Sequence, residues 1–372
     1  MKNTKNIIIY FPSIENGGME KNLFNLFNFL AKKKELNVIL CSTFINAKIK
    51  KKISKQIKLI QYKSKNNFFL NRYLISFFSF IFFYRKLKKN FFSKNTIIFS
   101  AQNSAISIVL SKILNFKIIV RNGNHPWSAL KFSDNLLPNI LSFILKLLTY
   151  NFANKIICNS KKTKDFFEYF IFDKRKLSSI ENSVNFNMKI KSFKKKNLIV
   201  SAGRLTKQKD FVTLLKGFKI FFENNKDYKL CILGEGKEKQ KLINLVINFD
   251  IKKNVIFKNY VNEPLPIFSS SKIYVCTSLY EGLPSSLIEA LSVKTPVIST
   301  DCLSGPNEIL ENGKYGYLFK IKDYKKLAYL MNYVVKNYSQ ATKKTLKGNK
   351  TLYKYQVENV ASKYLNEIKN LI

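Results

Sequence analysis

The stretch that decides the fold is NLIVSAGRLTKQKDFVTLLKGFKIFFE, residues 197–223. Its first six residues, 197–202, form a short apolar run that predicts a strand, and residues 211–223 predict a helix. The polar loop between them carries Gly203, Arg204 and Lys209. A strand that leads through a short loop into a helix is the repeating unit of a parallel sheet covered on both faces, so this stretch indicates an α/β fold.

The same alternation of strand and helix extends in both directions from this stretch. It is interrupted over residues 186–197, where the basic sequence FNMKIKSFKKKN has no clear period and predicts a linker. The two runs predict two doubly wound domains in tandem, and in such sheets ligands bind beyond the carboxyl ends of the strands. We predict strands over residues 6–11, 37–41, 96–100, 117–121, 155–159, 197–202, 228–233, 254–260, 272–278 and 296–300, and helices over residues 19–34, 211–223, 237–247, 286–293 and 323–336.

The length and composition fit two globular domains. The chain has 372 residues, of which 46% are hydrophobic, and a formal net charge of +42. Such a charge favours an anionic partner, but lysine, asparagine, isoleucine and phenylalanine are abundant throughout the chain, so compositional bias is an equal explanation. A sequence-specific nucleic-acid reader uses arginine for bidentate contacts, whereas nearly all the positive charge here is lysine, so we expect no nucleic-acid partner.

The sequence predicts a cytoplasmic protein. Its five cysteines include no CxxC pair and predict buried, reduced thiols. The first residues do not resemble a signal peptide. Residues 68–84 are the best candidate for a membrane span, but their uninterrupted apolar part, residues 73–84, is shorter than the roughly 20 residues that a span needs. This segment fits an amphipathic helix, either in the plane of a membrane or buried in the core.

Two loops after predicted strands carry residues suited to a phosphate ligand. Gly17 and Gly18 precede a helix and let backbone N–H groups approach a phosphate, although two glycines also make a plain tight turn. Arg204 and Lys209 combine a planar fork with a point charge, which suits a diphosphate. Arg204 is the more informative of the two cations, because arginine is scarce in this chain.

The segment EGLPSSLIEA, residues 281–290, is the most informative in the chain. Glu281 and Glu289 lie eight positions apart, roughly 12 Å along a helix, which exceeds the distance of about 5 to 9.5 Å between the acids of a glycosidase. Pro284 places Glu281 in a loop before the helix, so we expect the two carboxylates to hold different parts of one ligand. Glu289 also fits a capping box with Ser286, and Glu281 also fits a solvated loop acid.

Together these motifs resemble glycosyltransferase family four. The resemblance implies a GT-B fold, in which two Rossmann-like domains face a cleft. It places an N-terminal acceptor-side domain over residues 1–188, a C-terminal nucleotide-sugar-binding domain over residues 189–355, and a last helix over residues 356–372 that crosses back to the N-terminal domain. The matching motifs are GGME at residues 17–20, GRL with the following lysine at 203–209, LGEG at 233–236, the two glutamates at 281 and 289, PVIST at 296–300 and SGPNEI at 304–309.

The resemblance also implies roles for single residues. Arg204 and Lys209 would bind the donor diphosphate and stabilise the leaving group, with Glu281 beside them. His125, the only histidine, follows the predicted strand over residues 117–121 and is a candidate for contact with the reacting sugar. It fits a packed loop histidine equally, and Arg121 or Asn122 could take its place. The donor-binding positions implied are Gly17, Gly18, Tyr260, Val261, Gly282, Leu283, Pro284, Ser285 and Glu289.

The activity implied is hexosyl transfer with retention of anomeric configuration. The donor would be a nucleotide-diphosphate sugar, with UDP as the carrier, and the acceptor a lipid-linked or lipopolysaccharide-type glycan. No metal or other cofactor is expected, since the chain has no Asp-x-Asp motif and no histidine cluster. Residues 68–92 mix aromatic residues with lysine and fit the anionic inner face of the plasma membrane. A related sugar-nucleotide enzyme, such as an epimerase, and a nucleic-acid-binding protein are the alternatives.

Overall fold

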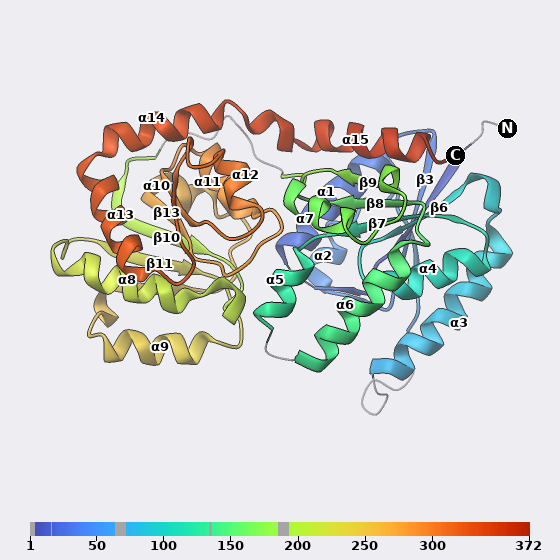
Figure 1. Ribbon diagram of the computed structural model, residues 1–372, viewed down its shortest axis with the longest axis horizontal. Helices are drawn as coiled ribbons and strands as arrows, with labels where there is room; N and C mark the ends of the chain where they lie inside the picture. Colours follow the sequence, from blue (N-terminus) through green and yellow to red (C-terminus); the bar gives the residue numbers. More distant parts are fainter. Residues whose placement is uncertain (1–3, 16, 64–71, 134–135, 185–192) are drawn as a thin grey trace. The chain divides into compact units, whose positions relative to one another are not determined.

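The computed structural model describes residues 4–15, 17–63, 72–133, 136–184 and 193–372 (Figure 1). Internal contacts divide the chain into two compact units. Each unit contains a parallel sheet with helices on both faces, so the predicted α/β class is confirmed. The first unit comprises Met1–Gly123, Asn135–Asn185 and Tyr355–Ile372, and the second comprises Asn124–Asp134 and Phe186–Lys354.

The first unit is built on a parallel sheet of order β5-β3-β1-β6-β7-β8-β9. Its central strands are buried on both faces, which is why they are continuous apolar runs. Alternate residues of β1 enter two different cores: Ile7 and Ile9 enter one, and Ile8 and Tyr10 the other. The strands are β1 (Lys5–Tyr10), β3 (Leu36–Ser42), β5 (Lys58–Gln61), β6 (Thr96–Ser100), β7 (Lys117–Asn122), β8 (Lys155–Cys158) and β9 (Leu177–Ser179), with a separate pair β2 (Ser13–Ile14) and β4 (Phe44–Ile45).

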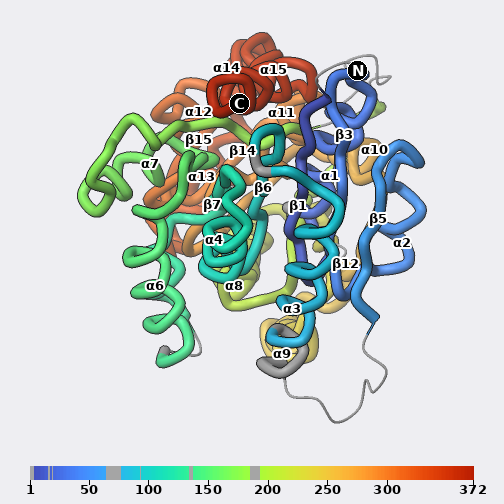
Figure 2. Tube along the Cα trace, turned by 90° about the vertical axis from the view of Figure 1, so that its right-hand side faces the viewer, coloured from blue at the N-terminus to red at the C-terminus, as the bar shows by residue number. Residues whose placement is uncertain are grey.

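Two layers of helices cover this sheet. In one layer, α1 and α15 pack together, and both Phe27 and Tyr364 contact Phe99 of β6. In the other layer, α3, α4, α6 and α7 contribute side chains such as Phe83 and Tyr150 to the second core. Within that layer α4 lies between α3 and α6 (Figures 1 and 2). The helices are α1 (Gly18–Ala31), α2 (Ala47–Lys50), α3 (Arg72–Asn90), α4 (Ser104–Ile113), α6 (Leu136–Tyr150), α7 (Lys161–Glu168) and α15 (Val357–Lys369).

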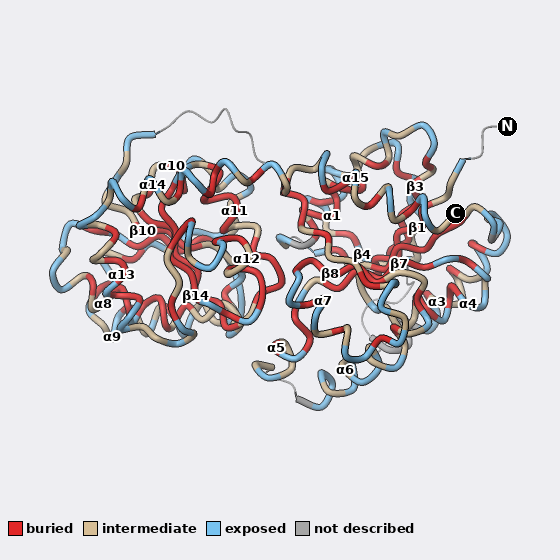
Figure 3. The backbone as a smooth tube through the Cα atoms, turned by 45° about the horizontal axis from the view of Figure 1, so that its top comes forward, coloured by how far each residue is buried: buried red, intermediate tan, exposed pale blue. Residues whose placement is uncertain are grey.

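The second unit has a parallel sheet of order β12-β11-β10-β13-β14-β15. Its strands are mostly buried, and its helices and loops carry most of the exposed residues (Figure 3). Leu214 and Phe218 of α8 share a core with Leu327 and Met331 of α13. The elements are β10 (Lys196–Ala202), β11 (Lys229–Leu233), β12 (Val255–Lys258), β13 (Ser271–Cys276), β14 (Val297–Thr300), β15 (Tyr317–Phe319), α5 (Pro126–Lys131), α8 (Phe211–Glu223), α9 (Lys239–Asn248), α10 (Leu265–Ser270), α11 (Ser285–Ser292), α12 (Pro306–Leu310), α13 (Tyr324–Lys336) and α14 (Tyr338–Asn349).

The sequence patterns missed the short strands at the ends of the two sheets. These strands, β5, β9 and β15, have the sequences KLIQ, LSS and YLF, which are too short for a periodic pattern. Of the predicted linker over residues 186–197, residues 186–192 lie outside the described residues, and Lys196 and Asn197 already belong to β10. All five cysteines are buried with free thiols, as the sequence predicted.

The segment considered for a membrane forms α3 from Arg72 onward, whereas residues 68–71 lie outside the described part. Phe83 and Leu87 are buried in the core of the first unit, while Phe77 is exposed. The described part of α3 is therefore at least partly a core helix, which is one of the two interpretations that the sequence left open. None of the helices described for this chain combines the length and the apolar composition needed to cross a bilayer.

Candidate functional site

Loops that follow neighbouring strands pack closely at the carboxyl edge of the second sheet, where its strands end. The loops after β10 and β11 touch through backbone, since the Leu205 N–H donates to the Glu235 carbonyl at 2.8 Å. Gly234 and Gly236 have φ of 147° and 158°, and a Cβ at either position would lie 2.0 or 2.3 Å from the backbone oxygen of Gly203 or Leu205. Only glycine fits such an approach, so this turn has a structural role.

A second close approach joins the loops after β13 and β14. Gly305 has a φ of 93°, and a Cβ there would lie 2.5 Å from the Gly282 carbonyl oxygen and 2.8 Å from Cδ of Pro284. The neighbouring Ser304 hydroxyl donates to the backbone carbonyl of Glu281 at 2.5 Å. The SGP motif therefore supports the loop that carries Glu281.

Lys209 and Glu281 form an ion pair at this edge. Lys209 ends the 3-10 turn Lys207–Lys209 that leads into α8, and its Nζ donates to Oε1 of Glu281. The two side chains are only 17% and 8% exposed. The Ser278 hydroxyl donates to the same carboxylate oxygen at 2.6 Å. Glu281 is therefore not the solvated loop acid that the sequence left open.

Further side chains hold the backbone on both sides of this ion pair. The Thr277 hydroxyl donates to the Lys209 carbonyl at 2.9 Å, and Nε2 of Gln208 donates to the Tyr280 carbonyl at 3.0 Å. No sequence motif indicates Thr277, Ser278 or Gln208. Their only sequence signal is their place directly after a strand or inside the basic loop, which many polar residues share.

The two predicted cations differ in their surroundings. Burial by itself would lower the pKa of Lys209, but the Glu281 carboxylate outweighs this effect, so the pKa lies above its ordinary value even though Arg204 opposes the increase. Arg204 is therefore close enough to influence the charge of Lys209, and it is exposed. Within the described ranges, no group of three or more His, Cys, Asp and Glu side chains is placed to hold a metal ion.

Glu289 is buried on α11, the helix that follows the Glu281 loop. The capping box that the sequence allowed for Ser286 and Glu289 is wrong, because α11 is capped by Pro284 and Ser286 lies inside the first turn, where it accepts from the Tyr274 hydroxyl at 2.7 Å. Burial is the main cause that raises the pKa of Tyr274, and both Glu281 and Glu289 add to it. The charges of both carboxylates thus act on the same buried tyrosine.

Tyr260 and Val261 follow β12, whose end lies at the same edge. The Tyr260 N–H lies 3.5 Å from Oε1 of Glu235, a long hydrogen bond to the neighbouring loop. The predicted residues of the C-terminal half thus follow strands of one sheet. They are Arg204, Lys209, Tyr260, Val261, Glu281, Gly282, Leu283, Pro284, Ser285 and Glu289.

The predicted glycines of the first unit lie at the start of α1. Gly17 is the N-cap, and a Cβ there would lie 2.4 Å from Oε2 of Glu20, because the Glu20 side chain folds back over it. Gly18 has no atom within 4 Å of the Cβ position, so this end of the helix is open on that side. Their role in donor binding stays a prediction.

His125 caps α5. Its Nδ1 lies 3.4 Å from the Ser128 N–H and 3.2 Å from the Ser128 hydroxyl, so a neutral ring carries its proton on Nε2. Burial lowers the pKa of the imidazole, which favours the neutral form. The structure shows this local capping role, and contact with a sugar stays a prediction.

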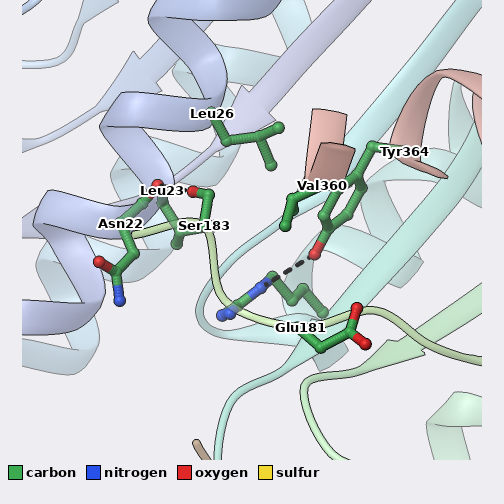
Figure 4. A pocket seen from close by; sticks show the side chains of 8 residues that line it. Asn22, Leu23, Leu26, Glu181, Ser183, Val360 and Tyr364 are labelled. Atoms are coloured by element: carbon green, nitrogen blue, oxygen red, sulfur yellow. Dashed lines mark hydrogen bonds between the residues drawn. The ribbon is translucent and has the colours of Figure 1, made fainter. Parts of the chain in front are cut away.

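Arg121, the alternative to His125, is buried in β7. Its Nε donates to the Tyr364 hydroxyl at 3.1 Å, the dashed line in Figure 4, and its Nη2 donates to Oδ1 of Asn182. The narrow space beside these groups, lined by side chains that include Asn22, does not admit a water molecule. Arg121 therefore ties α15 to the sheet of the first unit, a role that the sequence did not predict.

Comparison with known proteins shows what the chain is similar to. The profile of the family described as "Glycosyl transferases group 1" matches residues 184–351, which is nearly the whole second unit. The second unit therefore resembles this family. An uncharacterized glycosyltransferase of Methanocaldococcus jannaschii is 32% identical to it over 243 residues, which is 57% of this chain and 59% of the relative.

Two further proteins extend the similarity over the first unit of this chain. The N-acetylgalactosamine-N,N'-diacetylbacillosaminyl-diphospho-undecaprenol 4-alpha-N-acetylgalactosaminyltransferase of Campylobacter jejuni is 26% identical over 321 residues, which is 84% of this chain and 85% of the relative. The structure of Staphylococcus aureus TarM in complex with fondaparinux, alpha-GlcNAc-glycerol and UDP matches with a TM-score of 0.80 and 17% identity, covering 98% of this chain and 100% of TarM. The GT-B fold expected from the sequence is thereby confirmed.

Proposed function

We propose that this protein is a glycosyltransferase that moves a hexosyl group from a UDP-sugar to a lipid-linked glycan, with retention of anomeric configuration. The observation that carries the proposal is the Lys209–Glu281 ion pair, with Arg204 nearby, at the carboxyl edge of the sheet in the unit that the family profile matches. Nucleotides bind at this edge of doubly wound sheets, and a diphosphate calls for cations.

The donor would be held by its diphosphate. When the bond from the anomeric carbon to the diphosphate breaks, negative charge grows on the departing oxygen, and Arg204 and Lys209 would stabilise it. Glu281 keeps the Lys209 ammonium in one place before the donor arrives, so little reorganisation is needed at the moment of reaction. The backbone N–H groups of residues 282–285, at the start of α11, would add to this stabilisation, and Glu289 would hold the ribose hydroxyls.

UDP as the carrier is supported by TarM, whose structure contains UDP. Retention is supported by the Campylobacter relative, whose name specifies a 4-alpha transfer. An alpha product formed from an alpha-linked nucleotide sugar keeps its configuration. In that step the acceptor hydroxyl oxygen bonds to the anomeric carbon and loses its proton, and the nucleoside diphosphate leaves with the electron pair.

A lipid-linked acceptor is supported by the same relative, whose name specifies a diphospho-undecaprenol acceptor. We propose the same acceptor class for this chain, reached at the cytoplasmic face of a membrane. A lipopolysaccharide-type glycan, the other acceptor implied by the sequence, is the comparison to include in an acceptor assay.

Two measurements test the donor site. A panel of sugar nucleotides should include one that stabilises the protein against heat, since a ligand at a hundred times its dissociation constant adds about 2.7 kcal/mol to the free energy of unfolding. Arg204→Ala should lower turnover by about 10²-fold or more. Near-normal turnover of this variant would contradict the assignment of Arg204. An isomerised nucleotide sugar without a new glycosidic bond would instead indicate an epimerase.

A further inference from the structure

The outward side of α6 in the first unit carries an apolar stripe. Five exposed positions of α6 recur at helical spacing and are leucine or isoleucine, while Pro138, Asn139 and Ser142 are its other exposed residues. Leu137 is 81% exposed and Leu148 is 63% exposed, while Tyr150 on the same helix is buried in the core. A helix that is apolar on its outer side as well as its inner side is unusual on a solvated surface. The stripe consists of Leu137, Leu141, Ile144, Leu145 and Leu148.

The apolar surface continues beyond the end of α6. The Asn151 side chain accepts from the Phe172 N–H and donates to the Phe170 carbonyl, both at 3.0 Å, so the segment after α7 is fixed to the end of α6. Phe172 is 92% exposed, and Phe152 and Tyr169 are also exposed. We call the stripe together with Phe152, Tyr169 and Phe172 the apolar face.

Basic side chains accompany the apolar face. Residues 136–150 contain no acid, and their one charged residue is Lys146. Lys161 and Lys162 are exposed at the start of α7, and Lys174 and Arg175 lie two and three positions after Phe172. Of the three nearby acids, Glu168 is paired with Lys164 and Asp173 with Arg175, while Asp165 is exposed. The surroundings of the apolar face are therefore net positive.

The length and surroundings of α6 fit a helix that lies on a membrane surface better than a helix that crosses the membrane. The 15 residues of α6 extend over about 22 Å, which is less than the roughly 30 Å of a bilayer core. Apolar residues bordered by lysine and by exposed aromatic rings are typical of a helix that lies in the plane of a membrane. The sequence pointed instead to residues 68–92, but α3 in that stretch buries Phe83 and Leu87.

We propose that the apolar face docks this chain on an anionic lipid surface, with α6 in the membrane plane and the neighbouring lysines against lipid headgroups. The alternative occupant of the apolar face is a second copy of the chain. Each copy has a net charge of +42, and the residues around its apolar face are net positive, so two copies would repel each other there. An anionic lipid surface would attract the same residues. The proposal rests on the proposed function in one respect, because a lipid-linked acceptor lies at a membrane.

Co-sedimentation of the full chain with vesicles tests the proposal without any sugar. At low salt the protein should bind vesicles that contain phosphatidylglycerol and leave pure phosphatidylcholine vesicles in solution. The variant Leu141→Ser, Leu145→Ser, Leu148→Ser should partition about tenfold less. Its matched control is Ile247→Ser, Leu346→Ser, which changes exposed apolar residues of α9 and α14 in the second unit and should bind like the wild type.

Other results of these experiments would overturn the docking proposal or the proposed function. Absence of wild-type binding, or equal binding of the α6 variant, overturns it. A dimer in size-exclusion chromatography that the α6 variant loses, without vesicle binding, assigns the apolar face to an interface between copies and also overturns it. Stabilisation by UDP in solution tests the donor site separately. Vesicle binding without UDP binding therefore counts against the proposed function alone, and UDP binding without vesicle binding against the docking proposal alone.

Discussion

At the scale of single residues, the chemistry of the site depends on a lysine and a glutamate that are both nearly buried. Two charges removed from water are tolerable only as a pair, and the Ser278 hydroxyl adds a donor to the carboxylate. Loss of either partner leaves the other charge uncompensated. The same pair that we propose for diphosphate binding should therefore also affect the stability of the fold around it.

Replacing Lys209 should affect both properties, and a second substitution separates them. Lys209→Met should lower turnover by about 10²-fold or more and lower the free energy of unfolding by about 3 kcal/mol, because Glu281 is left buried and unpaired. The double variant Lys209→Met, Glu281→Gln should regain stability but not turnover. Urea unfolding and initial rates measure the two effects. Lys207→Met, at an exposed position of the same turn, is the control and should change neither by much.

His125 should make the stability of the protein depend on pH. Burial lowers its folded-state pKa, so the unfolded chain takes up a proton first as the pH falls. The contribution of the neutral ring is complete above the unfolded pKa of about 6.5 and is lost as the pH falls below it. Because the chain has one histidine, His125→Asn removes this whole effect while keeping a capping side chain. Equal losses of stability for both proteins between about pH 7.5 and 5.5 would contradict the prediction.

At the scale of elements, the site is made by loops that fit only because certain backbones approach each other. Gly305 shows this most clearly, since it combines a positive φ with a carbonyl oxygen at the place of a side chain. The Glu281 loop rests on this contact and on the Ser304 hydroxyl. Its shape is therefore set by a different strand and helix, β14 and α12.

Substitutions of Gly305 and of a second glycine with positive φ should separate the cost of the backbone conformation from the cost of the steric overlap with the Glu281 loop. Gly305→Ala should lower the free energy of unfolding by about 3 kcal/mol or more and reduce UDP affinity, because the new methyl group displaces the Glu281 loop. Gly313→Ala is the matched control: its φ is 86°, but its nearest neighbour is 3.8 Å away. It should cost only about 1 kcal/mol and leave UDP affinity unchanged. Thermal unfolding and a UDP titration compare the two, and equal effects would show that the contact does not matter.

At the scale of the whole molecule, the C-terminal helix α15 packs in the same unit as the N-terminal strands and helices. After the second unit, α15 joins the first unit, where it packs with α1 and where Tyr364 accepts from Arg121 of β7. The first unit is therefore complete only when the last residues of the chain are in place. If the buried Arg121 guanidinium loses a hydrogen-bond acceptor, one of its N–H groups is left buried without a partner, which costs free energy of folding.

Removal of the Tyr364 hydroxyl tests how much the contact between Arg121 and α15 contributes to stability. Tyr364→Phe should lower the free energy of unfolding by about 1 to 3 kcal/mol, because the Arg121 Nε–H loses its partner in a space that does not admit water. Tyr169→Phe, at an exposed position of the same unit, should leave stability within about 0.5 kcal/mol of the wild type. Urea unfolding measures both, and similar values would argue against a role for Arg121 in holding α15.

The sequence predicted the central strands and long helices because their apolar patterns are local. It predicted Arg204, Lys209, Glu281 and Glu289 as one group because they follow strands of one parallel sheet. It did not predict that Lys209 pairs with Glu281, since 72 positions separate them and either could have faced solvent. It allowed a capping box between Ser286 and Glu289, but the N-cap position of α11 is Pro284. The residue at which α11 begins depends on how the preceding loop packs.

The sequence by itself determined what each short segment forms, since hydrophobic periodicity, turn residues and motif spacing act within a few positions of the chain. Only the tertiary structure decided which polar side chains are buried together, which helix keeps an apolar side outward, and what Arg121 binds. Those outcomes depend on contacts between segments far apart in the chain. Burial then decides whether a charge must be paired or can stay in water.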